Sequence, residues 1–88
     1  MKYYQRLRDL RDDRELAQKE LAFILKTTQH QYARYEAGER ELPIHHYITL
    51  ANFYNISIDY LCGLADIPKT LDGSPYVFKH PKKITSTK

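Results

Sequence analysis

The side chains with the clearest chemical potential lie within residues 29–34. Gln29, His30 and Arg34 carry amide, imidazole and guanidinium groups, and helical spacing places them on one face. Glutamine can donate to and accept from an adenine edge, arginine can bind guanine through two hydrogen bonds, and neutral histidine offers one donor and one acceptor. Ala33 shares this face, so these four residues are the predicted base-contacting set. An ordinary solvated helix face would look much the same, so the pattern alone leaves both readings open.

The helix that must present these groups is predicted to begin after Thr28 and to end at Gly38. Thr28 followed by Gln31 matches a capping box, in which side chains satisfy free backbone N–H groups. Glycine is the residue expected just past a helix end. The opposite face of this helix carries Tyr32, Tyr35 and Glu36. That face is predicted to anchor the helix, which leaves the polar face free.

A second short helix is predicted just before it, at about residues 18–25, with an apolar side made of Leu21, Ala22 and Leu25. A polar break at residues 26–28 joins the two helices. Two helices joined by a short turn form a known motif, whose second helix reads base edges in the DNA major groove. The arrangement therefore predicts a partner, double-stranded DNA.

Four residues around this motif are predicted to contact phosphate: Gln18, Thr28, Gln31 and Arg40. Gln18 opens the earlier helix, where free backbone N–H groups favour an anion. Arg40 lies in the charged loop that follows the later helix. A loop arginine is a common surface residue, so this assignment is the least specific of the four.

Arg11 and Glu36 are predicted to form a structural ion pair. A first helix is predicted at about residues 3–14, with a packed stripe of Tyr3, Leu7, Leu10 and Arg14. Arg11 also falls on that stripe, and Glu36 falls on the tyrosine face of its own helix. An inward charge needs a partner of opposite sign, because a buried unpaired charge is costly. The alternative is that both are exposed ends of amphipathic side chains.

Two further helices are predicted between Pro43 and Gly63. Pro43 suits the first position of a helix that runs to about Tyr54. The apolar stripe of that helix is wide and comprises Ile44, Tyr47, Ile48, Leu50, Ala51 and Tyr54. Ser57 can cap a last helix that Gly63 ends. Residues 1–63 show no strand-length alternation, so the predicted fold is all-α with five helices.

Residues 64–88 lack helical periodicity and are predicted to form an irregular basic tail behind a domain of residues 1–63. The domain holds nine basic and nine acidic residues, whereas the tail holds five lysines and two aspartates. The net charge of +3 therefore lies in the tail and is no evidence that the globular part binds DNA. The apolar run Tyr76-Val77-Phe78 could dock on the domain, pair as an edge strand or stay loose.

The sequence of 88 residues gives little support for metal binding or catalysis. The candidate metal ligands His45, His46, Cys62 and His80 match no zinc spacing, and no metal or cofactor is expected. No nucleophile motif, phosphate-cradling glycine loop or paired-carboxylate signature predicts an enzyme. The single cysteine and the absence of a signal-peptide or membrane-spanning pattern predict a cytoplasmic protein without disulfides.

Residues 6–63 resemble the lambda-repressor-like helix-turn-helix domain of Cro and phage repressors, the xenobiotic-response-element (XRE) type. The resemblance rests on R-L-R-D-L-R-D-D-R-E-L-A-Q-K-E-L-A, T-T-Q-H-Q-Y-A-R-Y-E-A-G-E-R-E-L-P and L-A-N-F-Y-N-I-S-I-D-Y-L-C-G. It implies a five-helix domain that inserts its third helix into the major groove. It also implies phosphate contact at Gln18, base contact at Gln29, His30 and Arg34, and a salt bridge between Arg11 and Glu36.

The chain departs from this family pattern at three positions. Lys26 stands where the turn usually has glycine, which implies a strained or reshaped turn. Ala17 replaces the usual serine or threonine cap, which should cost about 1 kcal/mol of local stability. His30 stands where glutamine is frequent, so base preference at that position does not carry over.

The leading functional prediction is a sequence-specific transcriptional regulator, most simply a repressor that binds a short near-palindromic operator as a homodimer. One alternative is a DNA-binding antitoxin whose tail, with Tyr76-Val77-Phe78, holds a partner protein. The other is a protein-interaction module that does not bind DNA. The dimer is predicted to form through the last two helices, because the helix after Pro43 has more apolar positions than one core face needs.

Overall fold

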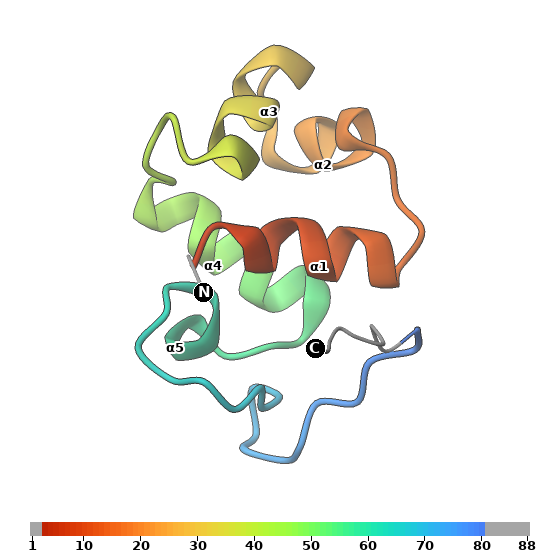
Figure 1. The fold of residues 1–88 in the computed structure, drawn as a ribbon, viewed down its shortest axis with the longest axis vertical. Helices are drawn as coiled ribbons and strands as arrows, with labels where there is room; N and C mark the ends of the chain where they lie inside the picture. Colours follow the sequence, from red (N-terminus) through yellow and green to blue (C-terminus); the bar gives the residue numbers. More distant parts are fainter. Residues whose placement is uncertain (1–2, 81–88) are drawn as a thin grey trace, which may run out of the picture.

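The computed structural model describes residues 3–80 and contains five helices within them (Figure 1). The helices are α1 (Gln5–Asp13), α2 (Gln18–Leu25), α3 (Gln29–Ala37), α4 (Ile44–Tyr54) and α5 (Ile58–Leu61). The described residues form no strand, only one isolated antiparallel bridge between Lys69 and Pro75. The predicted all-α fold with five helices is confirmed.

The helices are stacked so that α2 and α3 lie at one end of the molecule and α5 at the other (Figure 1). α1 and α4 lie between these ends, and all five helices contribute to one core. Its fully buried side chains of largest volume are Tyr32, Tyr54, Leu10, Leu21, Leu50, Ile56 and Leu61.

The start of each short helix follows from its capping residues. Ala17 offers no side-chain cap to α2, and the carboxylate of Glu20 instead accepts a hydrogen bond from the Ala17 N–H at 2.7 Å. The Thr28 hydroxyl caps α3 by accepting from the Gln31 N–H at 3.1 Å. The Gln31 amide turns away to Tyr35, so only one half of the predicted capping box forms. Ser57 caps α5 as predicted.

The outer face of α4 differs from its predicted stripe. Ile44 and Ile48 are 64% and 49% exposed, although both were predicted to face inward, while His46 is buried. Pro43 is the residue before the helix rather than its first turn. Six apolar positions cover too wide an arc of one helix to face a single core, so two of them remain on the surface.

The tail from Leu64 to His80 lies against the rest of the molecule and returns to the C-terminal end of α1 (Figure 1). Tyr76 and Phe78 dock on the core in half-buried positions, whereas Val77 is exposed. Residues 81–88 of the predicted tail lie outside the described part. The proposed division of the chain at residue 63 stays a prediction.

Three charged side chains hold this tail, two of them on α1 and the third on the residue that follows it. The Arg6 guanidinium donates to the carbonyl oxygens of Tyr60 and Ala65 at 2.6 and 2.7 Å. The buried Asp13 carboxylate accepts hydrogen bonds from the backbone N–H groups of residues 79 and 80. Arg14 donates to the Tyr54 carbonyl and to the Tyr76 hydroxyl. Below, the tail clasp means Arg6, Asp13 and Arg14 together with residues 64–80.

Candidate nucleic-acid interface

α2, the turn at residues 26–28 and α3 form one packed unit. The core-facing side of this unit consists of Leu21, Ala22, Leu25, Tyr32 and Tyr35, all buried. The turn reverses the chain because Lys26 adopts the left-handed backbone conformation, with φ of 59° and ψ of 44°. Gly38 ends α3 in the same conformation, as predicted. α3 is therefore fixed along its tyrosine face and at both ends.

The four predicted base-contacting residues lie on the side of α3 away from this core. Gln29 and His30 are exposed, and Ala33 and Arg34 are half-buried. The Arg34 Nε lies 3.5 Å from the Glu39 carboxylate, an exposed pairing of the kind that contributes between about 0 and 1 kcal/mol. So weak a contact leaves the guanidinium able to exchange Glu39 for a guanine edge.

The predicted phosphate-contacting residues differ in what their side chains do. Arg40 is exposed, and Thr28 uses its hydroxyl as a helix cap. The Gln18 amide donates to Glu36 at 3.2 Å, and the Gln31 amide donates to the Tyr35 hydroxyl at 3.3 Å. A glutamine amide has two N–H groups, so each of these side chains retains one for a phosphate oxygen.

Arg11 and Glu36 meet between α1 and α3. The Arg11 Nε lies 2.6 Å from one carboxylate oxygen of Glu36, and its second terminal nitrogen lies 3.0 Å from the other. The side chains are 13% and 5% exposed. The hydrogen bond to Glu36 raises the pKa of Arg11 above its ordinary value, although burial opposes this. Glu36 also accepts from Gln18, so one carboxylate connects α1, α2 and α3.

Sequence reasoning missed three buried polar residues: Arg6, Asp13 and His46. His46 packs edge-to-face against Tyr35, with ring centroids 5.8 Å apart, and joins α4 to α3. Burial, and then the neighbouring His45, lower the pKa of His46. Its position four residues before Leu50, which places both side chains on one face of α4, was the available signal.

The candidate metal ligands are dispersed by the fold. The His45 and His46 rings lie with centroids 4.2 Å apart and planes tilted by 50°. The Cys62 thiol donates to the Asp59 carbonyl, and His80 lies against Glu15. Within residues 3–80, no group of three or more histidine, cysteine or acidic side chains is placed to hold a metal ion. The described helices also include none that is long and apolar enough to cross a membrane.

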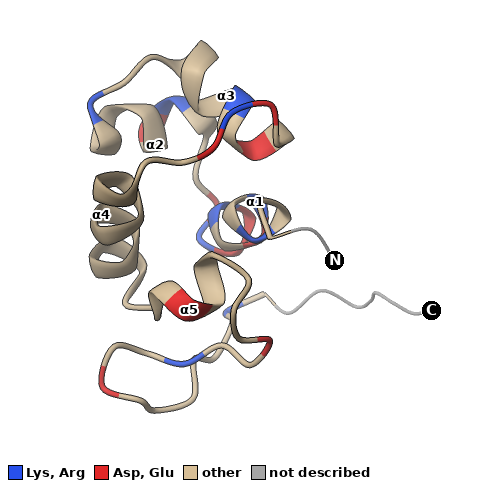
Figure 2. Ribbon diagram, turned by 90° about the vertical axis from the view of Figure 1, so that its left-hand side faces the viewer, with Lys and Arg blue, Asp and Glu red and all other residues tan. Residues whose placement is uncertain are grey.

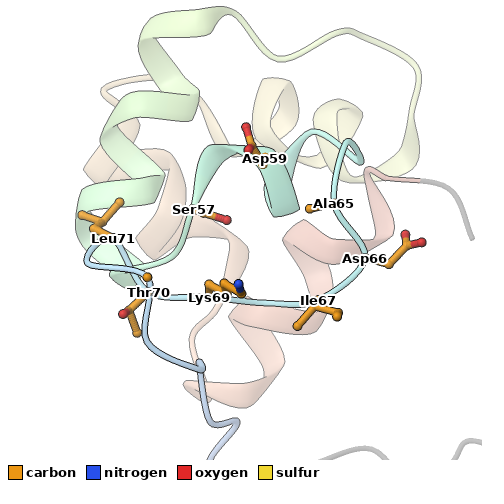
Figure 3. A pocket seen from close by; sticks show the side chains of 9 residues that line it. Ser57, Asp59, Ala65, Asp66, Ile67, Lys69, Thr70 and Leu71 are labelled. Atoms are coloured by element: carbon orange, nitrogen blue, oxygen red, sulfur yellow. The ribbon is translucent and has the colours of Figure 1, made fainter.

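A surface pocket of about 450 Å³ lies between α5 and the tail (Figure 3). Its lining consists of Ser57, Asp59, Ala65, Asp66, Ile67, Lys69, Thr70, Leu71 and Gly73. The pocket lies at the opposite end of the molecule from α3, so it is no part of the candidate interface.

Residues of both charge signs occur at both ends of the molecule, and only the side formed by α4 differs from them (Figure 2). Lysine and arginine occur on α2, in the turn after it and on α3, whereas α4 carries no lysine, arginine, aspartate or glutamate. A helix-turn-helix with an exposed polar second helix and cations around it defines a DNA-binding domain.

Comparison with known proteins gives the family. The family described as helix-turn-helix matches residues 7–61 of this chain. The chain is 38% identical over 66 residues to a Bacillus subtilis (strain 168) protein named "Uncharacterized HTH-type transcriptional regulator YobD". That match covers 75% of this chain and 59% of the relative, and no solved structure matches significantly. The chain belongs to the helix-turn-helix family of DNA-binding transcriptional regulators, of the lambda-repressor-like XRE type that the sequence predicted.

Proposed function

We infer that this protein is a sequence-specific transcriptional regulator that reads a short near-palindromic operator as a dimer and acts most simply as a repressor. The observation that carries the inference is the polarity of α3. Tyr32 is fully buried on one side, while Gln29, His30 and Arg34 present hydrogen-bonding groups on the other. An anchored helix with free polar groups on its outer face suits entry into a major groove.

The regulator reading is favoured over an antitoxin that holds a partner with its tail. Tyr76 and Phe78 are packed against the core, which leaves only Val77 of that run exposed. The name of the Bacillus subtilis relative, a transcriptional regulator, points the same way. The proposed function requires neither catalysis nor a cofactor.

Selection of bound duplexes from a random DNA pool tests the proposal directly. A regulator of this kind should enrich one sequence motif, with specific binding at least about a thousandfold tighter than binding to random duplex. A module that serves only protein interaction would enrich nothing, even at low salt.

Arg34→Ala should lose about 1–3 kcal/mol of discrimination at one base pair of the selected motif. Gln18→Ala should instead weaken all duplexes to a similar extent, because phosphate contacts carry no direct sequence information. Titrations of both variants on the selected duplex and on single-base variants of it measure the difference. Equal losses on selected and random DNA for both variants would contradict the assigned roles.

We expect the dimer to form through the uncharged outer face of α4, where Ile44 and Ile48 are exposed. A twofold axis would place two copies of α3 about 34–36 Å apart, one helical turn of DNA. Ile48→Glu should then lower affinity for the selected duplex by about 100-fold, through loss of the second chain's contribution.

Stoichiometry on the selected duplex checks the dimer, since two chains should bind one inverted repeat. Val77→Glu is the matched control, because Val77 is 80% exposed but lies in the tail. An asymmetric motif that binds one chain would rule out the dimer and leave base reading by α3 intact.

A further inference from the structure

Lys26 combines a strained backbone with an unengaged charge at the turn between α2 and α3. Its φ of 59° lies in the left-handed region, which disfavours residues with a side chain by about tenfold or more. The side chain is exposed, and no hydrogen bond or ion pair within residues 3–80 holds its ammonium group. A lysine here is therefore not explained by the folding of the described chain.

Among residues 3–80, the other left-handed residues with side chains are Glu15 and Asn55, and both have partners in the tail. The Asn55 side chain accepts from the Leu71 N–H, and Glu15 pairs with His80 at 3.1 Å. Asparagine also tolerates this conformation better than most residues. Lys26 has neither advantage.

The position of Lys26 at the end of α2 explains only in part why this residue is a lysine. A cation near the negative end of a helix favours the folded conformation by about two- to fivefold in its equilibrium constant. That is less than the left-handed backbone costs. Glycine at this position would avoid that cost. Strained residues of this kind gather at functional sites, where the surroundings require a particular side chain.

We propose that Lys26 contacts a DNA phosphate when α3 enters the major groove, and that this contact is the reason for a lysine in the turn. The inference rests on the proposed DNA reading by α3. Lys26 precedes the cap of α3 by two residues and the first predicted base-contacting residue, Gln29, by three. Backbone contacts flank base contacts in such interfaces, and lysine binds phosphate as a flexible point charge.

The test compares three substitutions on the duplex selected by the wild-type chain, as affinity against salt concentration. Lys26→Gln removes the charge and keeps the strain, whereas Lys26→Gly removes both. Each should lower affinity for selected and random duplex by about fivefold or more at low salt. Each should also reduce the slope of log affinity against log salt by about 0.9 for each bound chain, the value for one phosphate contact. Lys26→Arg should preserve both.

Urea unfolding distinguishes a DNA contact from a structural role. If Lys26 stabilised the fold, Lys26→Gly would lower the urea concentration of unfolding. Lys26→Gly should unfold at the same or a higher urea concentration while it binds DNA more weakly. Lys69→Gln, which neutralises an exposed tail lysine, and Asn55→Gly, which relieves the same backbone geometry elsewhere, should leave the salt slope unchanged.

Lys26→Gly or Lys26→Gln with wild-type affinity and slope would overturn the inference while DNA binding stands. Weaker binding by Lys26→Gly that follows a matching loss of folding stability would also overturn it. A wild-type chain that binds no duplex would overturn the proposed function, and the inference with it.

Discussion

Replacing Arg11 with alanine should lower the free energy of unfolding by about 3–5 kcal/mol, because it leaves a buried carboxylate without its cation. The Glu36 side chain is 5% exposed, so water cannot readily replace the two hydrogen bonds that Arg11 donates. A third bond, from Arg11 to the Leu16 carbonyl at 2.9 Å, is lost as well. For a domain whose total stability is about 5–15 kcal/mol, urea unfolding should show a large fall in midpoint.

A double substitution separates the pair from ordinary packing. Arg11→Met with Glu36→Leu should regain part of the lost stability, since replacing a buried ion pair by apolar residues is often neutral or better. Arg8→Ala is the control: Arg8 and Asp12 form a pair with 70% and 36% exposed side chains, and such surface pairs contribute between about 0 and 1 kcal/mol. A midpoint for Arg11→Ala no lower than that of Arg8→Ala would show that the pair is not structurally important.

Local sequence patterns were sufficient to locate the helix-turn-helix. α2 has the predicted bounds, and Thr28 and Gly38 delimit α3 as predicted. These features depend on capping chemistry and on one period of apolar residues, which act over a few neighbouring residues. The base-contacting and phosphate-contacting roles remain predictions, since they depend on a partner outside the chain.

The tail clasp could not be predicted, because its contacts join residues far apart in sequence. Arg6 reaches Ala65 across 59 positions, and Asp13 reaches His80 across 67. Both look like solvated charges on an amphipathic helix when α1 is read alone. That side of α1 is buried only because the tail packs against it. The tail has no apolar periodicity from which its packing site could be predicted.

The exposed surface of α4 was not predicted from its periodicity either. Ile44 and Ile48 belong to the same wide stripe as Leu50, but the core is filled by other side chains before it reaches them. Periodicity gives the direction in which a residue points, and does not say how far the core extends.

Ending the chain after residue 63 should destabilise the fold by about 3–6 kcal/mol, because the truncation removes the tail residues that Arg6, Asp13 and Arg14 bind. Arg6 would lose the Ala65 carbonyl and Asp66, and Asp13 would lose both of its backbone donors. The half-buried rings of Tyr76 and Phe78 would also leave the core. Urea unfolding of chains ending at residues 63 and 80 measures this difference.

A substitution at Asp13 tests whether these contacts, rather than chain length, are responsible. In the full chain, Asp13→Ala should cost about 1.5–3 kcal/mol, as expected for hydrogen bonds to a charged group. In the chain ending at residue 63 it should cost close to nothing, because its partners are already absent. Lys79→Ala is the control, since Lys79 engages Asp13 through its backbone alone. If truncation at residue 63 leaves the unfolding midpoint unchanged, the folding unit ends at Gly63 and the tail is an appendage. If the midpoint falls and the effect of Asp13→Ala disappears with the tail, residues 64–80 belong to the DNA-binding domain.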